Sequence, residues 1–331
     1  MTEKYKIYIP EDIKSRLAND AELFEFTKSD GSVNLNAFLK ELLINYFEPY
    51  RERKEKLLNT ILSDLSELSS ISKTDADVLA DRIINTYLRD DNSFSKSNAV
   101  ITLTVSGRSL EIINTIENNL LTDISLSQYL KDMFISYLSI SRGNRERIIF
   151  KETYEELTEA ISKRRTITFS STSSSGNGVF TMNPYLIATS KEEQYNYLLC
   201  YDPAAKHART FRMSRLTSLY STSNHFEIDE KVMEELKEVA LRNPQSASMN
   251  EMAKIRFTEK GKQKFKVIVK NRPDVYKKDG DVYYFNWPIR QLEEYFKRFG
   301  KDAVVLEPAK LRESMKIFYR KALDVYKKPV E

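Results

Sequence analysis

Three arginines and one phenylalanine near the middle of the 331-residue chain have the types and the spacing to bind an anion. They are Arg209, Phe211, Arg212 and Arg215, in the pattern Arg-x-Phe-Arg-x-x-Arg. A guanidinium group is always charged, can donate two parallel hydrogen bonds to a phosphate and stacks on flat rings. This chemistry favours a nucleic acid or another phosphate-bearing ligand.

Basic and aromatic side chains surround this element. Residues 161–220 contain eight lysines and arginines but only three acids. Aromatic rings stack on unpaired bases, which contributes about 1–3 kcal/mol per base, so the mixture is typical of a surface that binds single strands. The predicted nucleic-acid contacts are Lys163, Arg164, Arg165, Tyr185, Tyr197, Lys206, His207, Arg209, Arg212 and Arg215.

A structural role is the alternative for several of these residues. The arginines could instead form ion pairs with the nearby acids Glu192, Glu193 and Asp202. Tyr197 and Phe211 could pack in a hydrophobic core, and for Phe211 we favour this second interpretation.

The same region contains a series of short segments with the pattern of strands. They cover residues 164–169, 179–187, 195–201, 208–213 and 216–220, and a flexible loop is expected at 170–178. Short strands at near-regular spacing favour a small antiparallel barrel. Within the fourth strand, Arg209 and Phe211 should share one face, and Thr210 and Arg212 the other.

Residues 145–225 resemble the WYL domain family. The resemblance rests on Phe169, on two triplets and on the arginine segment; the triplets are Asn183-Pro184-Tyr185 and Asn196-Tyr197-Leu198. Asn196 stands where the family has the tryptophan of its name. The resemblance implies an Sm-like, SH3-type barrel of five strands whose pocket takes negatively charged ligands.

The N-terminal part contains an internal repeat. Residues 34–47 and 125–138 align without gaps and share five of fourteen positions, and each follows an alternating strand and a helix. This order resembles the ribbon-helix-helix family, in which two halves pair their strands. Because a lone strand is unstable, two copies in one chain imply an intramolecular pseudo-dimer. A helical connector is expected at residues 50–97.

In that family the outward side chains of the paired strands contact DNA in the major groove. Here they would be Lys4, Lys6, Tyr8, Thr102 and Thr104. Residues 1–143 carry 17 basic residues against 22 acids, which disfavours a polyanion. DNA binding by this ribbon and a purely structural use of it therefore both stay open.

The C-terminal part is the most basic, with 21 lysines and arginines against 12 acids in residues 251–331. Strands are expected at 254–257, 281–285 and 303–307, and helices at 259–268, 289–299 and 308–326, which suggests a small α/β sandwich. The last helix offers five apolar residues for a core or for a homodimer, which we expect: Leu311, Met315, Phe318, Ala322 and Val325.

Other classes of protein are disfavoured by residue content. The chain has one cysteine, two histidines and no glycine-rich phosphate loop, so we expect no enzyme, no metal site and no cofactor. It has neither an apolar leader nor a membrane-length apolar stretch, and we expect a cytoplasmic protein.

The expected fold class is α+β multidomain: a ribbon-helix-helix pseudo-dimer, an Sm/SH3-like antiparallel β-barrel and a small C-terminal α/β sandwich. The domains would cover residues 1–49, 50–97, 98–141, 142–250 and 251–331. This order is similar to the WYL accessory proteins of type VI-D CRISPR systems. The resemblance implies binding of single-stranded RNA and stimulation of an RNA-guided RNase. The alternative is a transcription regulator whose ribbon reads DNA and whose WYL domain senses a nucleotide or nucleic-acid ligand.

Overall fold

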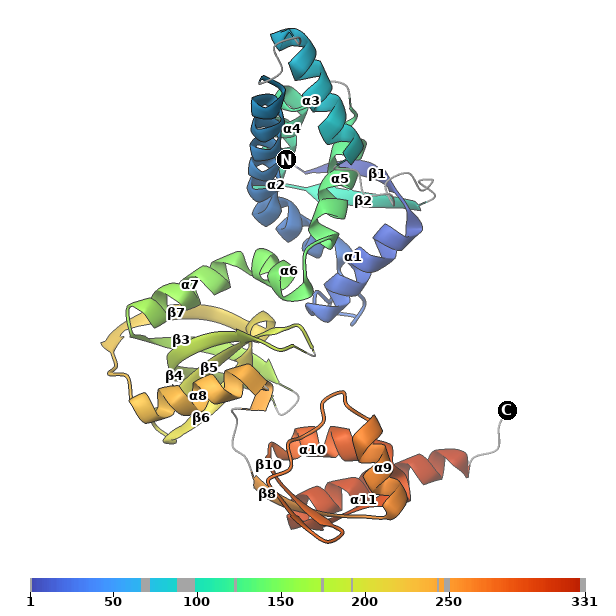
Figure 1. Ribbon diagram of the computed structural model, residues 1–331, viewed down its shortest axis with the longest axis vertical. Helices are drawn as coiled ribbons and strands as arrows, with labels where there is room; N and C mark the ends of the chain where they lie inside the picture. Colours follow the sequence, from blue (N-terminus) through green and yellow to red (C-terminus); the bar gives the residue numbers. More distant parts are fainter. Residues whose placement is uncertain are drawn as a thin grey trace. The chain divides into compact units, whose positions relative to one another are not determined.

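The structure, a computed structural model, describes residues 2–66, 72–87, 99–121, 124–173, 176–191, 193–242, 244–246 and 251–327. These residues form a mixed α+β fold, and among them are three antiparallel sheets of two, five and four strands (Figure 1). The chain divides into two compact units, Met1–Tyr154 and Glu155–Glu331, and helix α7 (Lys151–Ser162) crosses the division. The finer division into five domains stays a prediction.

The first unit consists of two strands and their helices. Its elements are β1 (Glu3–Ile9), α1 (Glu11–Leu23), α2 (Leu35–Ser66), α3 (Lys73–Tyr87), β2 (Ala99–Val105), α4 (Arg108–Asn119), α5 (Leu126–Leu138) and α6 (Arg142–Ile149). Strands β1 and β2 pair with each other as an antiparallel ribbon, so the predicted pairing of the two halves is confirmed. The assignment to the ribbon-helix-helix family stays a prediction.

Alternation along the ribbon separates a buried face from an exposed one. Ile7 and Ile9 on β1 and Ile101 and Leu103 on β2 are at most 4% exposed, because they face the helices. The ribbon contacts α2 and α5, the two helices of the internal repeat. These helices also bury apolar residues: Phe38, Leu39, Leu42, Leu130, Met133 and Phe134.

Helix α2 is longer than the sequence pattern predicts. The helix runs on through Pro49 to Ser66, so the expected domain boundary between residues 49 and 50 falls inside α2, and its second half lies in the region expected as a helical connector. Proline removes one backbone N–H and its ring crowds the preceding turn. Burial of Phe47 and Tyr50 on either side of Pro49 accompanies the unbroken helix. Helix α3 also lies in the region expected as a helical connector, and residues 67–71 and 88–97 of that region lie outside the described residues.

The second unit begins with the five-stranded sheet, in the order β6-β5-β4-β3-β7. Its strands are β3 (Arg165–Ser173), β4 (Gly176–Thr189), β5 (Asn196–Asp202), β6 (His207–Arg212) and β7 (Leu216–His225). Strand β4 pairs with β3 up to Met182 and with β5 from Asn183 onward. Its pairing with β5 has a register shift between Pro184 and Leu186. The turn η2 (Met213–Arg215) then leads the chain from β6 to β7 at the opposite edge.

Two expectations for this sheet are corrected. Within the described residues no ladder joins the edges β6 and β7, so the sheet is not a barrel closed by hydrogen bonds. The expected flexible loop at 170–178 is largely the continuation of β3 and β4, paired up to Ser173 and Gly176. Backbone pairing of a hairpin needs no apolar side chains, so a serine-rich segment can form paired strands.

Helix α8 (Glu230–Arg242) covers part of the five-stranded sheet. Leu236 packs with Tyr185, Tyr197 and Leu199 of β4 and β5. The turn η3 (Pro244–Ser246) follows, and Thr210 Oγ1 on β6 donates a hydrogen bond to the Pro244 carbonyl at 2.9 Å.

The four-stranded sheet has the order β11-β8-β10-β9. The strands of this sheet are β8 (Glu251–Phe257), β9 (Lys277–Asp279), β10 (Val282–Trp287) and β11 (Ala303–Glu307). The helices between and after them are α9 (Glu259–Val267), α10 (Ile289–Phe296), η4 (Lys297–Asp302) and α11 (Ala309–Tyr326). The three predicted strands and three predicted helices are confirmed, and β9 is an addition. Of the five apolar residues of the last helix, Leu311 and Met315 lie in the core.

Candidate nucleic-acid interface

A cavity of about 460 Å³ in the second unit brings together arginines and aromatic rings. Tyr195, Tyr197, Arg212 and Arg215 reach it from β5, β6 and the adjoining turns, and Arg298 reaches it from η4. Its volume lies in the range of small-ligand pockets, roughly 300–1,000 Å³. The remaining lining residues are Glu193, Thr210, Gln245, Asn271, Trp287, Gln291, Glu294 and Tyr295.

Arg212 and Tyr195 form a stacked pair at this cavity. The Arg212 guanidinium carbon lies 3.4 Å from the centroid of the Tyr195 ring. A guanidinium held flat against a ring keeps its N–H donors at its edge, where they can meet phosphate oxygens. Beside this pair, the Tyr197 hydroxyl donates a hydrogen bond to Glu193, and the Tyr197 side chain is 8% exposed.

Alternation along β6 determines which residues reach the cavity. Thr210 and Arg212 line it, whereas Phe211 packs against Phe169 and Phe180 with ring centroids 4.9 and 4.8 Å apart. Arg209 shares the Phe211 side. The predicted separation of faces is therefore confirmed, and Phe211, although half-buried, packs against core rings as the favoured interpretation expects.

Arg209 forms an ion pair and does not line the cavity. Its Nε lies 3.0 Å from Asp202 Oδ2 and 3.2 Å from His207 Nε2, and Asp202 is buried. Asp202 also accepts hydrogen bonds from the backbone N–H groups of Ala204 and Ala205 at 3.1 and 2.9 Å. The alternative interpretation thus holds for Arg209, which stabilises the β5–β6 turn.

Tyr185 is also corrected, because its ring faces are covered. It is 4% exposed, and its ring centroid lies 5.5 Å from that of Phe226. Its hydroxyl accepts a hydrogen bond from the Asp229 N–H at 3.2 Å. No base can stack on Tyr185 without opening this core.

The remaining predicted contacts lie away from the cavity. Lys163 pairs with Glu159 at the end of α7, and Arg164 follows in a turn with a positive φ of 53°. Arg165 opens β3 opposite His225. Lys206 lies in the β5–β6 turn and His207 opens β6, where its Nδ1 lies 3.1 Å from the Ala205 carbonyl oxygen. Of the ten predicted contacts, Tyr197, Arg212 and Arg215 are the three that the cavity brings together.

Several lining residues escape prediction because they lie far along the chain. Arg298 donates through Nη1 and Nη2 to the Lys270 carbonyl, both at 3.2 Å, and its guanidinium carbon lies 4.6 Å from the Tyr295 ring. Burial raises the pKa of the Tyr295 hydroxyl to about 12. Trp287 is the only tryptophan of the chain and completes the aromatic lining. The excess of lysine and arginine in residues 251–331 was the one sequence feature that could have pointed to a contribution of this segment to an anion-binding cavity.

The ribbon of the first unit presents a second basic surface. Lys4, Lys6 and Tyr8 on β1 and Thr102 on β2 are exposed, and Thr104 is half-buried. Lys4 lies opposite Thr104 and Lys6 opposite Thr102. The predicted outward face is confirmed, and Val100, which is 43% exposed, belongs to it as well.

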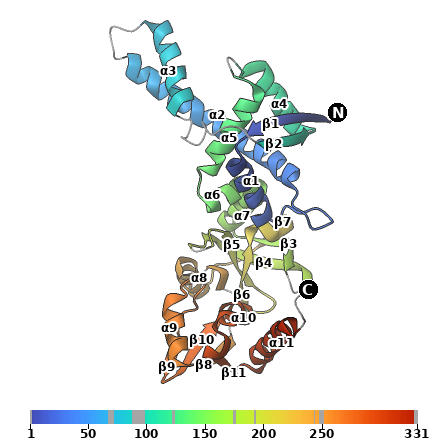
Figure 2. The ribbon, with the colours of Figure 1, turned by 90° about the vertical axis from the view of Figure 1, so that its right-hand side faces the viewer.

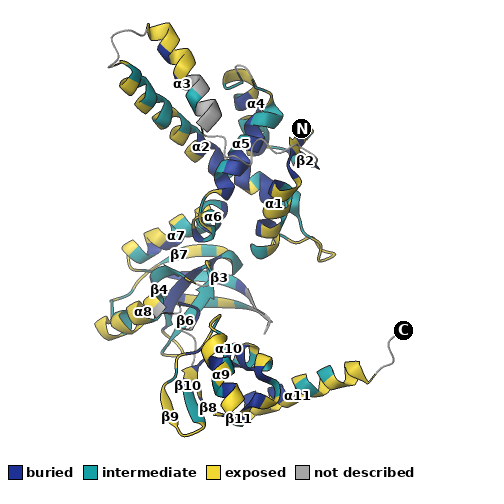
Figure 3. Cartoon of the chain, turned by 45° about the vertical axis from the view of Figure 1, so that its right-hand side comes forward, coloured by how far each residue is buried: buried dark blue, intermediate teal, exposed yellow. Residues whose placement is uncertain are grey.

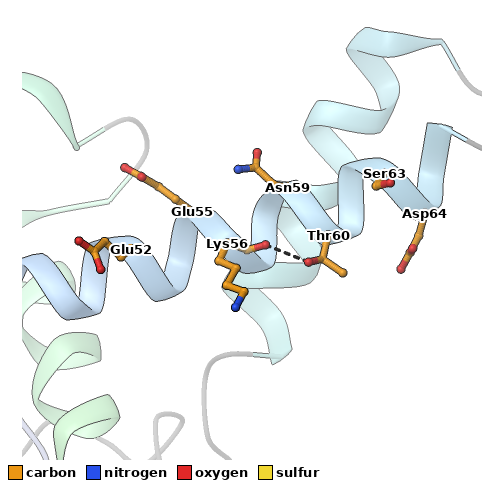
Figure 4. A pocket seen from close by; sticks show the side chains of 7 residues that line it. All are labelled: Glu52, Glu55, Lys56, Asn59, Thr60, Ser63 and Asp64. Carbon is orange, nitrogen blue, oxygen red and sulfur yellow. Dashed lines mark hydrogen bonds between the residues drawn. The ribbon is translucent and has the colours of Figure 1, made fainter.

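A hollow along α2 does not fit an anion. All of its lining residues come from one face of this single helix, as Figure 4 shows. Glu52, Glu55 and Asp64 supply three negative charges there, against Lys56 alone. It is therefore an open acidic helix surface and no nucleic-acid site.

Two features are absent from the described residues. No group of three or more His, Cys, Asp or Glu residues in the described part of the chain could hold a metal ion. Across the same ranges, no helix has the length and the apolar character to cross a membrane.

Comparison with known proteins identifies the fold. Residues 152–220 match the WYL domain family. The whole chain superposes on a solved structure described as a CRISPR Cas-related protein, with a TM-score of 0.67, 21% identity and coverage of 100% of this chain and 96% of the other. Proteasome accessory factor B/C (PafBC) of Arthrobacter aurescens is more distant, with a TM-score of 0.33, 13% identity and coverage of 98% and 50%. A search of the curated proteins finds no match.

Proposed function

We propose that this chain, which carries a WYL domain and resembles CRISPR-associated WYL proteins, is a non-catalytic nucleic-acid-binding accessory protein. It binds single-stranded RNA at the cavity of the second unit and stimulates the RNA-guided RNase of a type VI-D CRISPR system. The RNase is the protein partner in this proposal.

The observation that carries the proposal is the composition of the cavity. Three arginines, Arg212, Arg215 and Arg298, share it with the half-buried ring of Tyr195. Tyr197, Trp287 and Tyr295 line the same cavity, but they are at most 8% exposed and serve as its walls. Arginine binds phosphate through paired hydrogen bonds, and aromatic rings stack on exposed bases. Bases are available for stacking in a single strand and are covered in a duplex, so the mixture favours single strands.

Two acids in the cavity add selectivity to this chemistry. Glu193 and Glu294 line it together with the arginines. Carboxylates accept hydrogen bonds from the amino groups and the N–H edges of bases, and they repel phosphate. A nucleotide would therefore be oriented, with its phosphate toward the arginines and its base toward the rings and carboxylates.

The comparison with solved structures supports the choice of system. The CRISPR Cas-related protein shares the fold over the full chain at 21% identity. At 21% identity, this similarity shows a shared fold. The RNase partner is our own proposal, which starts from that shared fold.

Binding measurements test the proposal directly. We expect an unstructured RNA to bind more tightly than duplex DNA of equal length at two salt concentrations. Arg212→Ala and Arg215→Ala should each weaken RNA binding about tenfold or more and reduce the salt slope by about 0.7 per lost phosphate contact. Arg320→Ala, which removes an exposed charge from α11, is the matched control. Tighter binding of duplex DNA by the unaltered protein would overturn the proposal.

Stimulation of the RNase is a separate measurement. Cleavage of target RNA by a type VI-D effector should be faster with the unaltered chain than with the Arg212→Ala, Arg215→Ala double variant. Equal stimulation by both proteins would show that RNA binding at the cavity is not required.

A transcription regulator is the second candidate, and the ribbon favours it. Lys4, Lys6 and Thr102 present donors and positive charge on one exposed face of β1 and β2. In this case the cavity would sense a nucleotide or nucleic-acid ligand. Selection of bound duplexes from a random pool should then yield one preferred sequence, and Lys4→Ala with Lys6→Ala should abolish its binding. A pool that yields no preferred sequence would count against the regulator.

The oligomeric state is part of the proposal. On α11, Phe318 and Val325 are 37% and 68% exposed, whereas Leu311 and Met315 belong to the core. We expect a homodimer, and light scattering of the purified protein measures its mass.

A further inference from the structure

The four-stranded sheet of the second unit has one covered face and one open face. Ala253, Ile255 and Phe257 on β8 and Phe285 on β10 are at most 2% exposed. They belong to one core with residues of α10, η4 and α11, so these elements pack on the same side of the sheet (Figure 2). Figure 3 colours β9 as exposed, in agreement with its place at the edge of the sheet.

The open face is formed by the alternate residues of the same strands. Met252, Lys254 and Arg256 on β8 lie directly opposite Asn286, Tyr284 and Val282 on β10. Cross-strand partners share a face, so these six side chains form one surface. Arg256, Met252 and Asn286 are exposed, and Lys254 and Tyr284 are half-buried.

Tyr284 stands in the middle of this surface between two lysines. Strand β10 lies between β8 and β9, and Tyr284 pairs with Lys254 on one side and Lys277 on the other. The ammonium nitrogens of Lys254 and Lys277 lie 5.9 and 5.5 Å from the centroid of the Tyr284 ring. An aromatic ring flanked by cations is suited to a base and the phosphates on both sides of it.

The acids of this face lie on its outer strands. Glu307 on β11 pairs with Lys254 at 2.7 Å, and Asp279 on β9 lies opposite Val282. The central strands β8 and β10 carry two cations and no described acid on the open side. A polyanion that crosses β8 and β10 would therefore meet positive charge along the middle of the sheet.

We propose that the open face of this sheet is a second site for single-stranded RNA, centred on the Tyr284 ring. One base stacks on Tyr284, and Lys254, Arg256 and Lys277 contact the neighbouring phosphates. The site shares no residue with the cavity of Arg212 and Arg215. The inference rests on the proposed function in one respect, which is the choice of RNA as the ligand. A flat sheet with an aromatic residue on a central strand and helices behind it leaves bases room to spread and stack.

The experiment compares substitutions on the two faces of the same strands. Tyr284→Leu removes the aromatic ring, and Tyr284→Phe retains it. Lys277→Gln removes a charge from the open face. Lys278→Gln removes the same charge from the next position of β9, where the ammonium group lies 5.1 Å from the ring of Tyr283 on the covered side.

We expect Tyr284→Leu to weaken binding of a 20-nucleotide unstructured RNA by about 5- to 150-fold, the value of one lost stack. Tyr284→Phe should bind as the unaltered protein does. Lys277→Gln should weaken binding and reduce its salt slope, whereas Lys278→Gln should change neither. Crosslinking with RNA that contains 4-thiouridine should label the peptide of β10.

The outcomes separate this inference from the proposed function. If the unaltered protein binds no RNA, the proposed function and this inference both fail. If it binds RNA, loses binding on Arg212→Ala and retains full affinity in Tyr284→Leu, the inference alone fails. A Tyr284→Leu protein that changes its mass in light scattering, with RNA affinity intact, would show that the face contacts a second copy and would also overturn the inference.

Discussion

Asn36 on α2 makes two hydrogen bonds to the backbone of Thr104 on β2. Its Oδ1 accepts from the Thr104 N–H at 2.7 Å, and its Nδ2 donates to the Thr104 carbonyl at 3.3 Å. Ser127, the residue that aligns with Asn36 in the internal repeat, accepts from the Tyr8 N–H on β1 at 2.9 Å. Each half of the repeat thus holds the strand of the other half, which satisfies backbone groups that an isolated ribbon would leave to water.

Removal of these side chains should loosen the ribbon. We expect Asn36→Ala to destabilise the first unit by about 1–3 kcal/mol, and Ser127→Ala by about 1 kcal/mol, in proportion to the hydrogen bonds lost. Faster hydrogen exchange of the β1 and β2 amides in the full chain would report the change. Asn59→Ala, at an exposed position of the same helix, should stay within about 0.5 kcal/mol. Unchanged exchange in Asn36→Ala would show that the ribbon is stable without this support.

Arg209 and Arg212 should respond in opposite ways to substitution by alanine. Arg209→Ala leaves the buried Asp202 carboxylate without its ion pair, and we expect a loss of about 1–3 kcal/mol of stability with an unchanged salt slope of RNA binding. Arg212→Ala should weaken RNA binding with a smaller effect on stability. Thermal unfolding and RNA titration of both variants make the comparison. A stable Arg209→Ala protein with weak RNA binding would contradict this assignment.

Gly261 on α9 should tolerate no side chain. A Cβ at this position would lie 2.0 Å from the Asp302 carbonyl oxygen and 3.2 Å from the Phe257 ring. We expect Gly261→Ala to destabilise the four-stranded sheet and its helices by about 1–3 kcal/mol, because backbone would have to move. Urea denaturation followed by the fluorescence of Trp287, which lies in the same core as Phe257, measures this. Lys260→Ala, at the exposed neighbouring position, is the control, and equal stability of the two variants would contradict the clash.

The Asp302 carboxylate should make the stability of the second unit sensitive to acid. Lys264 Nζ lies 2.6 Å from Asp302 Oδ2, and Thr258 Oγ1 donates to Oδ1 at 3.3 Å. The hydrogen bond and charge of Lys264 lower the pKa of this carboxyl group below its usual value. Since the folded state binds the proton less readily than the unfolded state, the contribution is full above the unfolded pKa of about 3.9 and is lost as pH falls through the folded pKa.

Asp302→Asn isolates this effect. The difference in unfolding free energy between the unaltered protein and Asp302→Asn should be constant from pH 6 to pH 8, and it should shrink below about pH 4. Denaturation at a series of pH values provides the measurement. A difference that stays the same down to pH 3 would mean that the carboxylate gains nothing from Lys264.

Patterns that act within one element could be predicted well. The alternation of Lys4, Lys6 and Tyr8 identified the outward face of β1, and that of Arg209 to Arg212 identified the two faces of β6. The internal repeat predicted that β1 pairs with β2, because two half-ribbons in one chain satisfy each other. Expectations drawn from composition were less accurate. A flexible loop was expected at residues 170–178, but most of this segment belongs to the paired strands β3 and β4.

The sequence by itself determined the local elements, the faces of the strands and the basic character of the second half of the chain. Only the tertiary structure decided that Arg209 pairs with Asp202, that Tyr185 is buried, and that Arg298 and Trp287 share a cavity with Arg212. The reason is physical: periodicity states which side of an element a residue occupies, but the partner on that side belongs to another element. Whether a guanidinium meets a carboxylate, a ring or solvent depends on how distant segments pack.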